Sequence, residues 1–550
     1  MTLFARDAFS VPGETTRVAR AAFRKGNVYM TMRDELGLWY KDSEFASLFT
    51  SAEGRPAESP GRLALVTIMQ YAEGLTDRQA ADSVRGRIDW KYGLALPLED
   101  SGFDFSVLSE FRDRLLAGGL ETKLLDDMLA RFRDRGWVKA RGQQRTDSTH
   151  VLAAIRKMNH LERVGETLRA TLNALATVVP DWLRAQVTPD WFDRYGPRFE
   201  QYRLPQKKAE QEALAKAIGA DGYQLLAAIY ADSAPPWLRQ LPAVETLRQV
   251  WVQQYYVQDE HVSWRDEKNS PPSKEMIQSP YDPEARNRTK REVNWTGYVV
   301  HLTETCEADQ PHIITDVQTT PATTADGQMT AKVQVSLARK DLLPREHLVD
   351  TGYVDADLLV TSHTDYDIDL YGPVMPNSSW QVRSGSGCDL SCFAIDWEAQ
   401  RVTCPAGQVS RYWGAETDKQ GKAMISVRFD RQGCQACVRQ EQCTSNKTYG
   451  RTLHFRPQAQ HMALQAARQR QESPEFKEHY KLRAGIEGTL SQGTRAFDLR
   501  QARYIGLSKT CLQHVFTAAA MNLTRVVSWL ADNPRASTRQ SRFAALAHAA

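Results

Sequence analysis

Three carboxylates that lie far apart in the 550-residue chain occupy positions where a metal-dependent reaction on phosphate could be built. Asp147 lies in a strand-like stretch at 137–151, Asp350 ends the short apolar stretch HLVD, and Glu487 lies in a basic segment at 480–503. Carboxylates at strand ends and on a facing helix can hold two Mg²⁺ ions, which activate a water or hydroxyl and stabilise the oxygen that leaves a phosphodiester. A single Asp at a strand end also commonly caps a turn, so spacing alone leaves both interpretations open.

The basic segment at 480–503 combines charge with weak helix propensity. Tyr480, Arg483 and Glu487 are spaced i, i+3 and i+7, which places them on one face of a helix. The segment also contains three glycines, each of which costs a helix about 1 kcal/mol relative to alanine. It could be a solvated helix with one internal ion pair, or a helix whose backbone comes close to an anionic partner.

A second group of residues that could do chemistry is formed by cysteines. Cys404, Cys434, Cys437 and Cys443 have the spacing C-x29-C-x2-C-x5-C, which can close a tetrahedral Zn²⁺ site. The surrounding segment is polar and has no obvious apolar core, so a structural Zn²⁺ would stabilise it. Reduced cysteines without a metal are the alternative.

Two parts of the chain have the composition of DNA-contacting segments. An apolar helix over 62–74 ends at a glycine, and a second helix that contains Arg78 follows a Thr76 capping box, which is the outline of a helix-turn-helix. An ordinary helical hairpin is the alternative. Further on, a loop over 265–292 could follow a DNA backbone, or be a solvated loop; its basic residues and the aromatic residue after it are Arg286, Arg288, Lys290, Arg291 and Trp295.

The overall composition excludes several classes of protein. The chain has 70 basic and 67 acidic residues, so charge could favour DNA only locally. It shows neither a secretory signal nor a stretch apolar enough to span a membrane, and its 8 cysteines do not resemble a disulfide framework. We therefore expect a cytoplasmic protein.

The patterning predicts a mixed α/β core that is interrupted twice. Alternating stretches at 293–307 and 312–320, a helix over about 324–340, and short strands that contain Leu348 and Leu370 would form one sheet with the strand of Asp147. The expected divisions are a helical N-terminal DNA-binding domain at 1–135, the first strand at 137–151, a helical insertion at 152–285, the core continued at 286–375, a Cys-rich insertion at 376–455, the last core helices at 456–532 and a flexible tail at 533–550.

Several of these segments resemble a known family. The motifs RTDSTHVLAAIR, NWTGYVVHLTET, HLVDTGYVDADLL and YKLRAGIEGTLSQG resemble bacterial insertion-sequence transposases of the DDE class, in particular the IS-eleven-eighty-two-like group with an InsH-like N-terminal domain. The resemblance runs from about residue 40 to 530. It implies an RNase H-like catalytic core in which Asp147, Asp350 and Glu487 bind Mg²⁺.

Related families carry the signature Tyr-x2-Arg-x3-Glu-x6-Lys. Tyr480, Arg483 and Glu487 fit it, whereas Thr494 stands where the signature has Lys and Arg495 is the nearest base. The resemblance makes Tyr480, Arg483 and Arg495 candidates for contact with the DNA end.

The resemblance also implies a reaction and partners. The enzyme would cleave DNA at the terminal inverted repeats of its own element, and the 3′-OH would attack target DNA by transesterification. Pairing two ends implies a homodimer in the assembled complex, associated with the nucleoid. A DNA-binding protein that has lost catalysis, or a nuclease that cuts without joining, are the alternatives.

Overall fold

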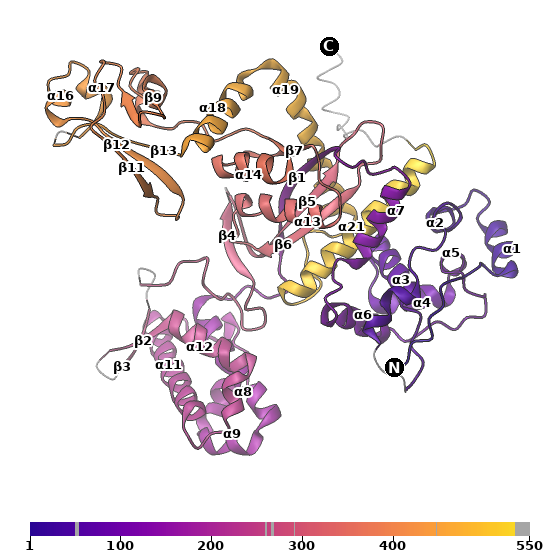
Figure 1. Ribbon diagram of the computed structural model, residues 1–550. Helices are drawn as coiled ribbons and strands as arrows, with labels where there is room; N and C mark the ends of the chain where they lie inside the picture. The colour runs from indigo at the N-terminus through magenta and orange to yellow at the C-terminus, as the bar shows by residue number, and fades with distance from the viewer. Residues whose placement is uncertain (50–53, 259–260, 266–268, 291, 447, 534–550) are drawn as a thin grey trace, which may run out of the picture.

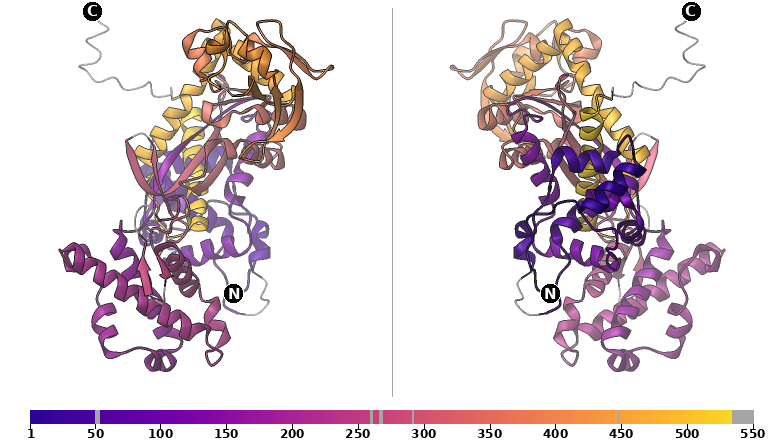
Figure 2. Two further views of the ribbon diagram at one scale, coloured as in Figure 1. Left: turned by 90° about the vertical axis from the view of Figure 1, so that its left-hand side faces the viewer. Right: turned by 90° about the vertical axis from the view of Figure 1, so that its right-hand side faces the viewer.

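The computed structural model describes residues 1–49, 54–258, 261–265, 269–290, 292–446 and 448–533. A central sheet is flanked by helices of the N-terminal part on one side (Figure 1). The helical insertion and the Cys-rich segment project from the core in different directions, and the turned views place them toward opposite ends of the molecule (Figure 2). Most of the tail expected at 533–550 lies outside the described residues.

The central sheet is mixed and has six strands among the described residues. Its order is β4-β5-β1-β7-β8, and β6 pairs with β5 beyond the end of β4. Strand β1 is antiparallel to β5 and parallel to β7, which is parallel to β8. The strands are β1 (Gln143–Leu152), β4 (Arg286–Lys290), β5 (Val293–Thr305), β6 (Ile314–Pro321), β7 (Glu346–Val349) and β8 (Asp369–Tyr371). This mixed α/β arrangement is compatible with the expected RNase H-like core.

Strand β5 is buried along most of its length because it has neighbours on both edges and is covered on both faces. Its β-branched and aromatic residues suit such a position. Strand β4 corrects one expectation, because residues 286–290 are an edge strand and not part of a loop. An edge strand tolerates the charged sequence RNRTK, since one of its edges faces solvent.

The helices of the core follow the expected pattern. They are α13 (Thr330–Arg339), α14 (Ala356–Tyr366), α18 (Gln458–Glu472), α19 (Pro474–Tyr480), the 3-10 turn η7 (Lys481–Ala484), α20 (Gly485–Ala496) and α21 (Leu507–Leu530). Helix α21 is largely buried and packs against β6 and against α3 of the N-terminal part. Ile68, Leu129, Val300 and Phe516 belong to one continuous apolar cluster, so the N-terminal helices and the sheet share a core.

The N-terminal part contains α1 (Gly13–Ala22), α2 (Val28–Leu36), α3 (Pro60–Glu73), α4 (Asp77–Gly86), α5 (Ile88–Gly93), α6 (Ser106–Ala117) and α7 (Lys123–Asp134). The capping box is confirmed, since Thr76 accepts from the Gln79 amide and Gln79 accepts from the Thr76 amide. The second helix of the expected pair, α4, ends at Gly86. Arg87 has extended backbone angles and separates α4 from α5.

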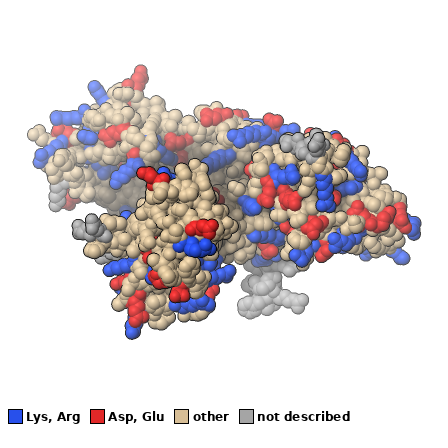
Figure 3. Space-filling model, turned by 90° about the horizontal axis from the view of Figure 1, so that it is seen from below, with Lys and Arg blue, Asp and Glu red and all other residues tan. Residues whose placement is uncertain are grey.

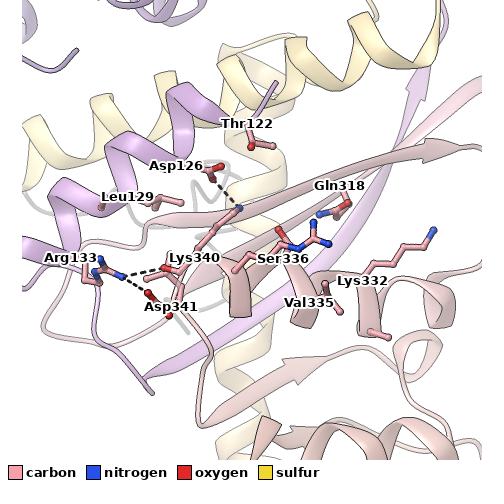
Figure 4. A pocket seen from close by; sticks show the side chains of 14 residues that line it. Thr122, Asp126, Leu129, Arg133, Gln318, Lys332, Val335, Ser336, Lys340 and Asp341 are labelled. Carbon is pink, nitrogen blue, oxygen red and sulfur yellow. Dashed lines mark hydrogen bonds and ion pairs between the residues drawn. The ribbon is translucent and has the colours of Figure 1, made fainter. Parts of the chain in front are cut away.

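A cleft lies where α7 meets α13 (Figure 4). Lys340 pairs there with Asp126 of α7 at 3.4 Å and with Asp316 of β6 at 2.8 Å. Arg133 pairs with Asp341 at 3.5 Å. These contacts join the N-terminal helices to the core, and none of the three candidate carboxylates lines the cleft.

The helical insertion has its own apolar core, which includes Leu168, Leu225 and Trp251. Pro180 begins the helix that follows α8, as proline often does at a first helical position. The elements are α8 (His160–Val178), α9 (Pro180–Gln186), α10 (Pro189–Tyr195), α11 (Lys208–Tyr230), α12 (Pro242–Gln254) and the hairpin of β2 (Tyr255–Gln258) and β3 (His261–Trp264).

The Cys-rich segment differs from the sequence expectation because it does have a core. Val402, Val427, Phe429, Leu453 and Phe455 pack together between two small sheets. The elements are α15 (Trp380–Ser384), β9 (Ala394–Asp396), β10 (Arg401–Thr403), β11 (Tyr412–Thr417), β12 (Ala423–Arg428), α16 (Arg431–Gln435), α17 (Gln440–Cys443) and β13 (Thr452–Phe455). No helix in the described ranges is long and apolar enough to cross a membrane.

Candidate active site

Asp147 and Asp350 are brought together by the pairing of two parallel strands. Thr146 of β1 is in register with Val349 of β7, and each aspartate directly follows one of these residues. The two carboxylates therefore lie side by side on neighbouring strands, Asp147 in the middle of β1 and Asp350 just past the end of β7. Asp350 also caps the 3-10 turn η5 (Thr351–Tyr353), because its Oδ1 accepts the Thr351 amide at 2.7 Å.

An arginine side chain connects Glu487 to Asp147. Glu487 lies in the first turn of α20, and its Oε1 is 3.1 Å from Nη1 of Arg483. Nη2 of the same guanidinium is 2.5 Å from Oδ2 of Asp147. Arg483 thus links the first and third carboxylates, which are 340 residues apart in the chain.

The segment that carries these residues is not one α-helix. Tyr480 ends α19, Arg483 lies in η7, and Glu487 lies in α20. The turns remain continuous, and the expected shared face is kept between Arg483 and Glu487. The Tyr480 hydroxyl donates to the carbonyl of Val349 at 3.2 Å, directly before Asp350. The segment therefore contacts the end of β7 through Tyr480 and the middle of β1 through Arg483.

Burial and neighbouring charges set the acidity of the site. Burial raises the pKa of Asp147, the Arg483 guanidinium opposes this shift, and the Asp350 and Asp326 carboxylates add to it. Burial also raises the pKa of the Tyr480 phenol to about 12. Asp147 is therefore harder to ionise than an ordinary aspartate, and Arg483 is the group that favours its charged form.

A fourth carboxylate, Asp326, was not found from the sequence. Its Oδ1 accepts from the Ser148 hydroxyl at 3.3 Å, and its Oδ2 is 3.4 Å from Nζ of Lys290. Asp326 begins the 3-10 turn η4 (Asp326–Gln328), which lies before α13. It is in a turn sequence without a recognisable motif, so only the fold brings it next to β1.

The expected DNA-contacting residues fall into different environments. Arg78 and Arg495 are exposed, and the Arg78 guanidinium lies 4.4 Å from the centre of the Phe105 ring. Arg288 donates to the carbonyls of Ala322 and Thr324 at 3.0 and 3.1 Å. Figure 3 shows basic and acidic side chains interspersed on the face seen from below, without a surface of one sign.

Trp295 does not suit the expected contact with a DNA backbone. Its side chain is buried, and its indole N–H donates to the carbonyl of Tyr298 at 3.1 Å. It packs with Val299 and Ala322, and Arg288 lies 6.0 Å from its ring centre. The ring is part of the core because residues 286–290 pair with β5. Arg291 lies outside the described residues.

The carboxylate oxygens of Asp147, Asp350 and Glu487 are the donors that a hard divalent cation prefers. In the described part of the chain, however, no three His, Cys, Asp or Glu side chains lie close enough together to hold an ion. At the candidate site, the Arg483 guanidinium lies between Asp147 and Glu487. The donor types therefore fit Mg²⁺, and Glu487 would have to exchange Arg483 for the ion.

The expected zinc ligands are not gathered into one site among the residues described. Cys404, Cys434 and Cys443 all pack against the apolar core of the Cys-rich segment, whereas Cys437 does not. Burial raises the pKa of the Cys443 thiol to about 11, and Cys388 is one of its neighbours. The zinc site stays a prediction.

Comparisons with known proteins give two matches. Residues 403–527 match a family model described as a transposase DDE domain, and residues 18–114 match one described as a transposase domain, DUF772. The first match contains Glu487 but neither Asp147 nor Asp350. No curated protein and no solved structure matches the chain.

Proposed function

Since the chain belongs to the DDE transposases of bacterial insertion sequences, we propose that it cuts DNA at the ends of its own element and joins the freed ends to target DNA. The observation that supports this proposal is that Asp147 and Asp350 lie side by side on neighbouring strands, with Glu487 tied to Asp147 through Arg483. These three carboxylates come from three distant parts of the chain, and Glu487 would have to approach the two aspartates for all three to hold one ion.

The proposed roles follow from position and charge. Asp147, Asp350 and Glu487 would hold Mg²⁺, which when bound activates the attacking hydroxyl and stabilises the leaving oxygen of the phosphodiester. Two ions in each site are proposed. Arg483 neutralises Asp147 and Glu487 in the free protein, and on release from them its guanidinium would bind a phosphate of the DNA end.

DNA is the proposed partner, as terminal inverted repeats and as target. The exposed Arg78 and Arg495 support contact with the backbone, because lysine and arginine supply most of the affinity for phosphates. Lys290 and Arg288 are weaker candidates for contact with the DNA backbone, because they already pair with Asp326 and with the Ala322 carbonyl. We propose that a homodimer pairs two element ends in the cytoplasm, at the nucleoid.

The proposal is tested by incubating the protein with Mg²⁺, a labelled element end and target DNA. Joined products support the transposase. Cleavage without joining would identify a nuclease, and binding without cleavage a DNA-binding protein that has lost catalysis. Glu166→Gln, in the helical insertion, is a control variant because it alters a buried carboxylate outside the carboxylate set.

A further inference from the structure

Glu304 of β5 is a completely buried carboxylate that lies in the NWTGYVVHLTET stretch but is not one of the expected site residues. It lies opposite Arg145 of β1 in the strand register. Its Oε1 accepts from Nε of Arg145 at 2.8 Å, and its Oε2 is 2.8 Å from Nη1 of Arg525 on α21. Burial raises its pKa, but Arg525 and Arg145 outweigh that effect and hold the pKa below the ordinary value.

The same carboxylate binds the helix that carries Glu487. The Thr489 hydroxyl of α20 donates to Oε2 of Glu304 at 2.5 Å. Arg525 donates to the Thr489 hydroxyl at 2.6 Å and to Oε1 of Gln492 at 2.9 Å. Ion pairs and hydrogen bonds around one buried charge therefore fix α20 from its inner side.

The turn before α20 is held from the same point. Nη1 of Arg145 donates to the carbonyl of Leu482 in η7 at 2.5 Å. The guanidinium lies so close to Gly485 that a Cβ there would be 2.0 Å from Nη1. Glycine is thus required at the start of α20 for Arg145 to reach both Glu304 and Leu482.

We propose that Glu304 is a positioning residue, which holds η7 and α20 so that Arg483 and Glu487 stay beside Asp147 of β1. The effect of Glu304 on catalysis rests on the proposed function, whereas its effect on the position of α20 rests only on the contacts described above. Side chains that orient metal ligands typically change metal affinity or activity by about 10- to 100-fold when they are replaced. Glu304 acts through the helix and touches neither the DNA nor the three carboxylates.

The test compares Glu304→Gln with Glu166→Gln, which removes a buried carboxylate that pairs with Arg169 and accepts the Phe199 amide in the helical insertion. The first measurement is amide hydrogen exchange over residues 485–496 in protein without metal or DNA. We expect faster exchange there in Glu304→Gln and no change in Glu166→Gln. Equal exchange in both variants would overturn the proposal.

The second measurement is the Mg²⁺ concentration that gives half-maximal cleavage of an element end. We expect this concentration to rise about 10-fold or more in Glu304→Gln and to stay unchanged in Glu166→Gln. An unchanged requirement in a folded, active Glu304→Gln would contradict the proposal. If the wild-type protein did not cleave, the proposed function would fail, and the exchange measurement would still decide whether Glu304 holds α20.

A milder variant covers the case in which Glu304→Gln does not fold. Thr489→Val keeps the shape of the side chain and leaves the Glu304 charge paired with both arginines. It removes the hydrogen bonds that join the Thr489 hydroxyl to Glu304 and to Arg525 but keeps the bond from Arg525 to Gln492, so we expect the same two changes at smaller size. If exchange over 485–496 and the Mg²⁺ requirement both stayed at wild-type values, Glu304 would have no part in positioning the helix.

Discussion

Two glycines in the same helix are expected to respond to alanine in opposite ways. A Cβ on Gly485 would lie 2.0 Å from Nη1 and 2.4 Å from Cζ of Arg145, whereas a Cβ on Gly488 would meet nothing within 4 Å. Arg145 cannot move aside freely, because its guanidinium is bound to Glu304 and to the Leu482 carbonyl. Gly485→Ala must therefore break buried hydrogen bonds or displace η7.

The magnitudes follow from this difference. Alanine is favoured over glycine inside a helix by about 1 kcal/mol, so Gly488→Ala should stabilise α20 by about that amount. Inserting an extra carbon into a packed site costs about 1 to 3 kcal/mol, so Gly485→Ala should destabilise α20 by about that amount. The two variants should therefore differ by about 2 to 4 kcal/mol in the free energy of opening α20.

Native-state hydrogen exchange is the suitable assay, because a chain of several domains does not unfold in one step. Amides over 485–496 should exchange faster in Gly485→Ala and more slowly in Gly488→Ala than in the wild type. Amides in α11 of the helical insertion serve as the internal reference in each sample. If Gly485→Ala were as well protected as Gly488→Ala, Arg145 would not be fixed beneath the helix, and the reasoning about Glu304 would fail with it.

Three further predictions concern the charges of the site and the cysteines. Because Arg483 lowers the pKa of Asp147, Arg483→Gln should raise that pKa further and move the acid limb of the pH–rate profile of cleavage to higher pH; an unmoved limb would refute the pairing. Because Asp326 raises the same pKa, Asp326→Asn should move the limb to lower pH, and a shift in the same direction as that of Arg483→Gln would contradict the assigned charges. If the Cys-rich segment binds Zn²⁺, purified protein should contain about one ion per chain, and Cys434→Ser should lose it. Purified wild-type protein that contains no zinc would refute this prediction.

The sequence could predict the candidate site where it depends on local pattern. Asp147 lies within a recognisable strand and Asp350 directly follows another, and the parallel pairing of these strands brings the two residues side by side. The break between Tyr480 and Glu487 was not predictable in detail, because a 3-10 turn and an α-helix need similar residues.

The features that the sequence could not predict depend on contacts between residues that are far apart in the chain. Glu304 is 221 residues from Arg525, and no local pattern distinguishes it from a polar residue near the end of a strand. Asp326 becomes a neighbour of Asp147 only through the packing of η4 beside β1. Trp295 follows basic residues that the sequence places in a loop, because the charged edge strand they form lacks the apolar alternation of an ordinary strand.

The central claim is that Asp147, Asp350 and Glu487 form the catalytic centre, and Asp350→Asn tests it most directly. Asparagine caps a helical turn as well as aspartate does, so this variant should keep the bond to Thr351 and lose only the charge. Asp355→Asn is the control, since Asp355 is a nearby capping aspartate that accepts the Leu358 amide at the start of α14 and pairs with Lys422, outside the carboxylate set.

The decisive measurement is cleavage and joining of a labelled element end in the presence of Mg²⁺. We expect Asp350→Asn to bind the end normally and to lose both reactions, while Asp355→Asn keeps them. Cleavage or joining by Asp350→Asn at the rate of Asp355→Asn would contradict the assignment of the site.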